Sequence, residues 1–246
     1  MEVHAQTHTA RKKWTHYFWE FLMLFLAVFC GFLAENQREH YVERQREKQY
    51  IRSLISDVKT DTTNITRWSR RFNQIKKSCD TLLNNFDSLP KGYSVKGGRN
   101  YFSIISGFPD FIYTDRTIQQ LKNSGGMRLI RNAAAADSII AYDAAVRDIL
   151  VEEIGVSKYY FQLHDLTNKI LSYRKMGSAF RIKTAEEIEN QKINFWIKQD
   201  PEQFEYLYNL FYIYGKAVNS YIGFLSQLKN QGARLVDFLQ KEYRLK

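Results

Sequence analysis

Residues 51–86, IRSLISDVKTDTTNITRWSRRFNQIKKSCDTLLNNF, repeat a pattern in which apolar side chains recur at alternating steps of three and four residues. The repeat occupies Ile51, Leu54, Val58, Asp61, Ile65, Trp68, Phe72, Ile75, Cys79, Leu82 and Phe86. Asp61 is its one clearly polar member. Such a repeat predicts a long helix with a coiled-coil-like seam. Because no Pro or Gly lies between residues 35 and 89, we expect the helix to continue from the preceding segment and to end near Ser88.

The same spacing recurs twice further along the chain. The second heptad is Ile139, Tyr142, Val146, Ile149, Glu153, Val156, Tyr160, Leu163, Thr167 and Ile170. The third is Leu207, Phe211, Tyr214, Val218, Tyr221, Leu225, Leu228, Gly232, Leu235 and Leu239, and it follows a cap-like Asp200-Pro201. We therefore predict an all-α fold with long helices at 37–87, 127–175 and 201–243. Because each helix has one apolar stripe, an elongated antiparallel bundle would bury all three.

The connections between these helices carry weaker signals. Residues 88–114 hold Pro and Gly and break the heptad, so we expect a loop or cap there. Within it, residues 101–105 fit a short strand, and a cap with short helical turns fits as well. Short helices are expected at about 115–123 and 185–197.

An apolar run precedes the first heptad. Residues 16–36, HYFWEFLMLFLAVFCGFLAEN, contain one carboxylate, Glu20, before the charge that ends the run. The uncharged part, 21–34, is short enough for a signal peptide, but the run reaches the length of a membrane span when Trp14 is included. A small-x-small cleavage pattern is absent at its end. We therefore predict an uncleaved transmembrane helix at 14–36, continuing into the bundle.

Basic residues suggest the orientation of this helix. Arg11, Lys12 and Lys13 abut its N-terminal side. A raw count favours the opposite side, where Arg38, Arg44, Arg46, Lys48 and Arg52 follow. Because the positive-inside rule weakens for long translocated domains, we expect a cytoplasmic tail at 1–13 and an extracytoplasmic domain at 37–246.

One face of the predicted span suits association with another helix. Its members follow one another at steps of four, three, four and three: Glu20, Leu24, Ala27, Gly31 and Ala34. Ala27 and Gly31 form a small-x-x-x-small step, which lets two helix backbones approach. His16 lies one turn before Glu20, so the two form a candidate interfacial pair. Glu20 therefore has either a packing role at the membrane interface or a proton-handling role.

The sequence lacks the motifs of common catalytic, metal and nucleotide sites. Of the five histidines only His4 and His8 have metal-site spacing, and their place in the tail favours solvation. Cys30 and Cys79 cannot pair if the apolar run spans a membrane. No phosphate loop, nucleophile elbow or dinucleotide fingerprint occurs. We predict no catalytic, cofactor-binding or metal-ligating residue and no cofactor.

Polar residues within the heptads are the remaining candidates for a site. Asp61, Glu153 and Thr167 act either as register devices at the edge of the seam or as a buried polar site. The formal charge of +10 is spread along the chain without a nucleic-acid-reading motif, so we expect no nucleic acid partner.

Two stretches of the chain each follow a recognisable pattern. Residues 19–61 have a Glu, an apolar run, a polar neck and a Tyr-hydrophobic-x-x-Leu segment. Residues 117–143 have a helix, a Ser-Gly pair and a second helix. The matching residues in 19–61 are Glu20, Gly31, Ala34, Tyr50, Leu54, Asp57 and Asp61. Those in 117–143 are Leu121, Ser124, Gly125, Leu129, Ile130 and Tyr142. Here the chain resembles an uncharacterised family of single-pass membrane proteins of Bacteroidota. The resemblance implies a bacterial inner membrane, a helical periplasmic domain and no assigned activity.

The leading functional hypothesis is a membrane-anchored helical scaffold or interaction module without catalysis of its own. Its expected partners are the lipid bilayer and either further copies bound through the transmembrane helix or another membrane protein. An alternative is a subunit of an ion-driven or transport complex that uses Glu20, because a carboxylate within a bilayer is usually retained for a function. A sensor domain is the second alternative, and an enzyme the least favoured.

Overall fold

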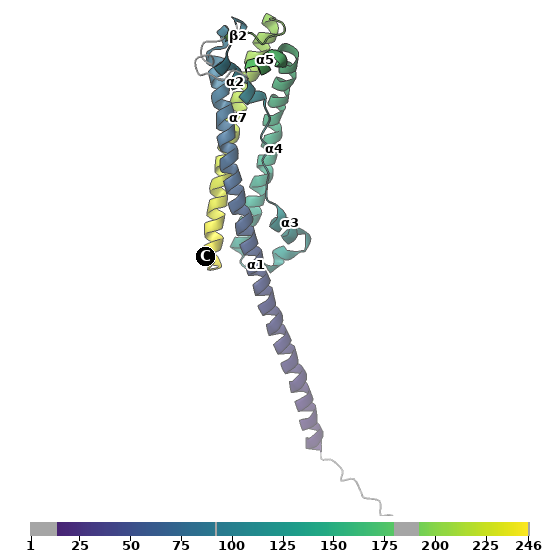
Figure 1. Cartoon of the computed structure of the whole chain (residues 1–246). Helices are drawn as coiled ribbons and strands as arrows, with labels where there is room; N and C mark the ends of the chain where they lie inside the picture. Colours follow the sequence, from purple (N-terminus) through teal and green to yellow (C-terminus); the bar gives the residue numbers. More distant parts are fainter. Residues whose placement is uncertain (1–13, 92, 180–191, 246) are drawn as a thin grey trace, which may run out of the picture. The chain divides into compact units, whose positions relative to one another are not determined.

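The computed structural model describes residues 14–91, 93–179 and 192–245, and within them the all-α prediction is confirmed (Figure 1). The helices are α1 (Trp14–Asn84), α2 (Val95–Ile105), α3 (Arg116–Asn123), α4 (Ala133–Ile170), α5 (Tyr173–Ala179) and α7 (Pro201–Glu242). The short 3-10 helices η1 (Phe86–Lys91) and η2 (Gly126–Leu129) and the two-residue antiparallel strands β1 (Tyr93–Ser94) and β2 (Lys192–Ile193) complete the order. The predicted tail at 1–13 lies outside the described residues.

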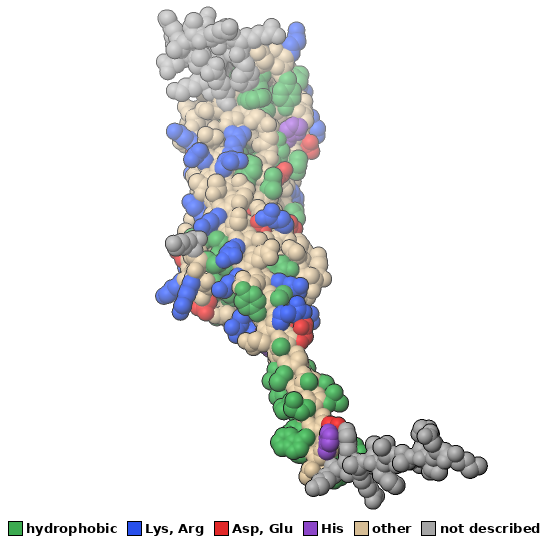
Figure 2. Space-filling model, turned by 60° about the horizontal axis from the view of Figure 1, so that its bottom comes forward, with side chains coloured by type: hydrophobic (Ala, Val, Ile, Leu, Met, Phe, Trp, Pro, Cys, Tyr) green, Lys and Arg blue, Asp and Glu red, His purple; other side chains and the backbone are tan. Residues whose placement is uncertain are grey.

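The chain divides into two compact units, Met1–Gln49 and Tyr50–Lys246, and α1 contributes to both. In the first unit, the large apolar side chains of α1 between Trp14 and Leu33 are exposed, apart from the half-buried Leu22. Among the described helices, α1 is the one whose length and apolar composition suit a membrane span. Figure 2 shows hydrophobic side chains around this part of α1, whereas Lys and Arg are spread over the second unit.

The three heptads form the core of the second unit, as predicted. Every position of the third heptad is buried. In the first, only Trp68 and Phe86 are half-buried, and in the second only Glu153. The periodic pattern therefore identified the buried face of each long helix, because a seam must be removed from water along its whole length.

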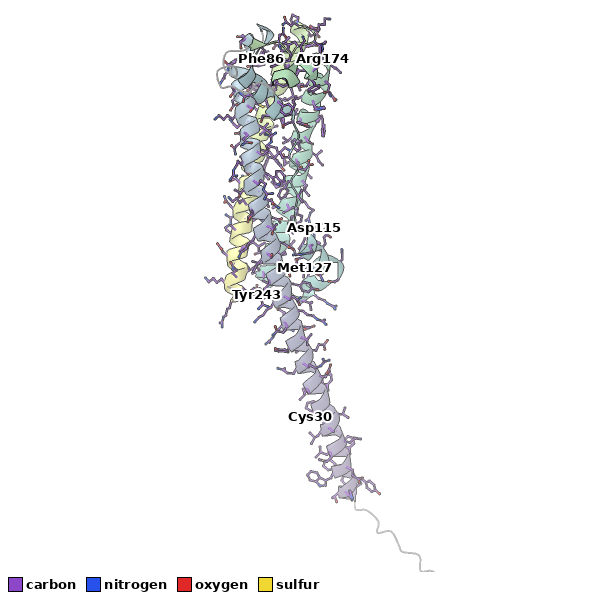
Figure 3. All side chains as sticks on the ribbon, in the orientation of Figure 1. Cys30, Phe86, Asp115, Met127, Arg174 and Tyr243 are labelled. Atoms are coloured by element: carbon purple, nitrogen blue, oxygen red, sulfur yellow. The ribbon has the colours of Figure 1, made fainter. Side chains whose placement is uncertain are left out.

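The structure gives the relative directions of the three long helices of the bundle. The α7 helix runs antiparallel to α1, because Gly215 faces Cys79 whereas Gly232 faces Val58. The α4 helix runs parallel to α1, because Tyr142 contacts Asp61, near the start of the α1 part of the bundle, whereas Thr167 contacts the α2 helix that follows the end of α1. In Figure 3, Phe86 and Arg174 lie at one end of the bundle, and Met127 and Tyr243 toward the other.

The parallel arrangement depends on the connection between α1 and α4. The loop predicted at 88–114 contains α2, so residues 101–105 are helical and the strand alternative is wrong. Tyr101, Ile104 and Ile105 lie on one buried face, at the spacing that a helix requires. Residues 106–115 then return along the bundle to α3 without helical structure. We call residues 106–115 the crossing segment.

Helix ends follow their capping residues. The α4 helix begins at Ala133 and not at 127, because the Asn132 side chain accepts a hydrogen bond from Ala135 N. It ends at Ile170, so the predicted helix 127–175 was too long at both ends. The α7 helix begins as expected, with Asp200 as its cap and Pro201 at its first position.

The other short connections give mixed results. The α3 helix agrees with the prediction at 115–123, and a left-handed Gly125 follows it at φ 66°. The predicted helix 185–197 falls partly outside the described residues, and its end is not helical. There, β2 pairs with β1, and Ile197 N donates to Ile170 O at 2.8 Å. Extended pairing satisfies this backbone, and Phe195 and Trp196 beside it are both buried.

Candidate functional site

The predicted association face of α1 lies within the first unit. Its members are all exposed: Glu20, Leu24, Ala27, Gly31 and Ala34. A Cβ added at Gly31 would meet no atom within 4 Å, so the helix surface is open there to another backbone. His16 Nδ1 lies 3.4 Å from Glu20 Oε1, and each side chain is 50% exposed. The predicted pair is therefore close in space, and association through this face stays a prediction.

In the second unit, buried polar side chains concentrate along the crossing segment. Asp61 of α1 is fully buried, and its Oδ1 accepts a hydrogen bond from Thr114 N at 2.9 Å. Its Oδ2 accepts one from the Tyr142 hydroxyl at 3.3 Å. Burial raises the pKa of Asp61 to about 6, although the bonds from Thr114 and Tyr142 oppose that rise. Asp61 thus joins α1 and α4 to the crossing segment.

Glu153 performs a similar role from α4. Both of its carboxylate oxygens lie 3.2 Å from Phe111 N, and the Tyr221 hydroxyl of α7 donates to Oε2 at 3.0 Å. Burial raises the pKa of Glu153, and the bonds from Phe111 and Tyr221 oppose that rise. Glu153 of the second heptad therefore holds the middle of the crossing segment.

The third polar heptad position fixes α2. Thr167 Oγ1 lies 3.0 Å from the Tyr101 hydroxyl, and it also bonds Leu163 O within its own helix. From α1, Arg71 Nη2 donates to Ser103 O at 2.6 Å, near the end of α2. These contacts anchor α2 between α1 and α4, immediately before the crossing segment begins.

Two buried carboxylates of the second unit were not identified from the heptads. Asp57 accepts hydrogen bonds from Thr117 N at 3.1 Å, from the Thr117 hydroxyl and from Arg116 Nη2 at 2.7 Å. Asp143 accepts one from Lys122 Nζ at 2.5 Å and another from Arg147. Both lie beside seam positions and not on them. The sequence could have singled out Asp57, because it and Asp61 are the only acidic residues between residues 50 and 79.

The buried carboxylates of the second unit hold backbone in place, and few of their oxygens are left to contact a substrate. Asp57, Asp61 and Glu153 each use both carboxylate oxygens to accept hydrogen bonds from protein donors. A catalytic carboxylate needs an oxygen that can reach a substrate. Asp61 and Thr167 are fully buried, so these two positions are buried polar sites and not the edge of a seam. Their hydrogen-bond partners are protein groups, so they position other elements of the bundle. Within the described residues, no group of three or more His, Cys, Asp or Glu side chains could hold a metal ion.

Comparison of the chain with protein-family models, curated proteins and solved structures returns no match. Function is therefore inferred from the geometry of the two units. Membership of the Bacteroidota family stays a prediction from the residues of 19–61 and 117–143.

Proposed function

We propose that this chain is a membrane-anchored scaffold whose helical bundle, within residues 50–246, binds partner proteins and performs no catalysis. The observation that carries the proposal is α1 itself. One helix begins with exposed apolar side chains and continues without a break into a core helix of the bundle. An exposed apolar run of this length is stable in a bilayer and unfavourable in water. The use of the buried carboxylates as backbone acceptors is additional support.

The proposal includes a location and an assembly. The chain would lie in a bacterial inner membrane, with residues 1–13 in the cytoplasm and the bundle in the periplasm. Support comes from the basic residues that abut the N-terminal side of the span and from the family resemblance. Copies would associate through Ala27 and Gly31.

Fractionation of the full chain tests the anchor. Expressed in a Gram-negative host, the full chain should stay with membranes after a carbonate wash, and a variant lacking residues 1–36 should not. External protease applied to spheroplasts should cleave the bundle and spare an N-terminal tag. Recovery of the full chain in the wash would refute the anchor, and protection of the bundle would refute the orientation.

A second candidate function is a subunit of a proton-driven complex, favoured by the 3.4 Å approach of His16 to Glu20. It predicts that Glu20→Gln abolishes proton uptake by proteoliposomes that contain the native complex, while assembly of the complex is intact. Uptake at the unmodified rate would exclude this candidate.

A further inference from the structure

A groove between α1 and α7 is lined by cations and hydroxyl groups. Its volume is about 490 Å³, a size that small-molecule sites have. Within the second unit the two helices lie side by side (Figure 1), and a Cβ at Gly232 of α7 would lie 3.0 Å from Thr62 Cγ2 of α1. We call this the basic groove, and its walls are Thr62, Thr63, Thr66, Arg67, Arg70 and Lys229.

The cations of the basic groove are unpaired. Among the described residues, the side chains of Arg67, Arg70 and Lys229 form no ion pair and no hydrogen bond, whereas Lys76 on the same face of α1 pairs with Asp80. Arg67 and Arg70 are three residues apart and are therefore neighbours on the surface of α1. Like charges around one groove repel one another, and an anion between them replaces that repulsion by attraction.

The acidic residues of α1 do not balance this charge. Between Asp61 and Asp80 the sequence of α1 contains no acid. Asp61 is fully buried, and both of its carboxylate oxygens accept hydrogen bonds from the crossing segment and α4. Asp57 is buried against α3 in the same way. Asp80 lies 2.6 Å from Lys76 and contributes to a different hollow.

The α7 side of the groove is equally free of acids. Between Glu205 and Asp237 the sequence of α7 contains no Asp or Glu. Asp237 follows Lys229 by eight residues, which is about 12 Å along the helix axis, and it does not line the groove. The described walls of the basic groove therefore contain cations and no carboxylate.

The extent of the positive charge indicates a compact anion. Further along the same two helices, a second hollow is lined by Lys76, Asp80 and Lys216, so a carboxylate interrupts the row of cations there. A nucleic acid strand requires a positively charged groove that follows its backbone over several phosphates. A single phosphate group requires only a few converging donors. The charge pattern therefore favours a small phosphate ester over a polymer.

The threonines of the groove add acceptors to these donors. Thr62 and Thr63 each donate a hydrogen bond to Lys59 O, and Thr66 donates to Thr62 O, all at 2.9 Å. A hydroxyl group that has given its one hydrogen keeps lone pairs that accept. Inorganic phosphate dianion can use the cations but has little to offer these acceptors. A phosphate ester that also carries hydroxyl groups can use both.

We propose that the basic groove binds a phosphorylated sugar or polyol, with its phosphate held by Arg67, Arg70 and Lys229 and its hydroxyl groups donating to Thr63 and Thr66. The planar guanidinium groups suit two-point contact with phosphate oxygens. The ester is either soluble or the headgroup of a lipid, since the chemistry is shared. This ligand site goes beyond the proposed scaffold function and does not depend on it.

Titration of the full chain in phosphatidylcholine nanodiscs tests the inference. Calorimetry should show saturable binding of glucose 6-phosphate, binding of inorganic phosphate that is weaker by at least about threefold, and no saturable binding of glucose. In a second arm, the nanodiscs are floated with vesicles of phosphatidylcholine with or without phosphatidylinositol. Binding of the free ester identifies a soluble ligand, and binding of the phosphatidylinositol vesicles alone identifies a lipid headgroup. Either result supports the site.

Matched variants locate the binding. Arg70→Gln should weaken binding by about tenfold or more, and Arg70→Lys by at least about threefold, because lysine keeps the charge but loses the two-point contact. Thr66→Val should lower the affinity for glucose 6-phosphate by about threefold and leave that for inorganic phosphate unchanged. Lys77→Gln is the control, because it removes an exposed cation of α1 outside the groove, and it should bind as the unmodified chain does.

Three results would overturn the inference. The first is the absence of saturable binding of both the free ester and the vesicles. The second is equal loss of binding in Arg70→Gln and Lys77→Gln, which would show that net charge alone attracts the anion. The third is equal binding of glucose 6-phosphate and inorganic phosphate, which would exclude a sugar or polyol as the preferred ligand. The carbonate wash scores the membrane anchor separately from all three.

Discussion

Replacement of Asp61 by asparagine tests whether this buried carboxylate limits the stability of the bundle. The asparagine oxygen would keep an acceptor for Thr114 N, and its amide could donate to the Tyr142 oxygen, so both contacts of Asp61 can persist. What the variant removes is the ionisation of a fully buried group. We therefore expect Asp61→Asn to stabilise the bundle near neutral pH.

The size of the effect follows from the pKa. Burial raises the pKa of Asp61 from 3.8 to about 6, so the folded state holds the proton more tightly than the unfolded state. A carboxyl group of this kind stabilises the fold below about pH 4, and that stability is lost as the pH rises through about 6. At about 1.4 kcal/mol per pKa unit, the advantage of asparagine over aspartate should grow by roughly 2–3 kcal/mol between about pH 4 and about pH 7.

The assay compares the two chains at each pH. Urea unfolding of the full chain in mild detergent, followed by far-UV circular dichroism, gives the free energy of unfolding for the bundle. Hydrogen exchange of peptides covering Thr114 reports the crossing segment directly. Groups that do not interact with Asp61 titrate equally in both chains, so their contribution cancels in the difference.

Asp61→Ala is the control for the hydrogen bonds. It leaves the Thr114 amide and the Tyr142 hydroxyl without their acceptor, so it should be less stable than Asp61→Asn by about 1–3 kcal/mol at both pH values. An asparagine variant that is less stable than the unmodified chain at neutral pH, or a difference that does not change with pH, would refute the reasoning.

Two further predictions concern α7. Gly232→Leu should destabilise the bundle by about 1–3 kcal/mol in urea unfolding, because a Cβ there would lie 3.0 Å from Thr62 Cγ2. Gly223→Leu on the same helix meets nothing within 4 Å and should be neutral or stabilising by up to about 1 kcal/mol, and equal effects at both glycines would contradict this packing. Tyr214→Phe should raise the free energy of unfolding or leave it within about 1 kcal/mol. The reason is that the Tyr214 hydroxyl is buried without a hydrogen-bond partner among the described residues. A large loss of unfolding free energy in the same urea assay would contradict this prediction.

Heptad periodicity predicted the helical core because one physical requirement, burial of an apolar stripe, repeats at every turn. Leu82, Tyr142 and Leu239 lie far apart in the sequence, and each is buried as the pattern required. Periodicity carries no information about direction. It therefore left the parallel arrangement of α1 and α4 unpredicted, and an antiparallel bundle was the simplest solution.

The heptads drew attention to the polar residues that interrupt a seam but not to the buried carboxylates beside it. Asp61, Glu153 and Thr167 stood out because apolar neighbours surround them in the heptad, and all three bind the segments that connect α1 to α4. Asp57 precedes a seam position, where an acid on a helix surface is ordinary, so its burial depended on tertiary contacts with α3. The end of the predicted helix 185–197 is extended for a similar reason, because pairing with β1 outweighs local preference.

The crossing segment has a consequence for how the protein folds. Because α1 and α4 are parallel, contacts between them join residues far apart in the chain, such as Asp61 and Tyr142 at 81 positions. The antiparallel pair α4 and α7 can instead close progressively from the connection between Ile170 and Pro201. Loop-closure entropy thus favours an early hairpin of α4 and α7, to which α1 is added later. The helix that is synthesised first would complete its core last, only after the C-terminal half of the chain has been made.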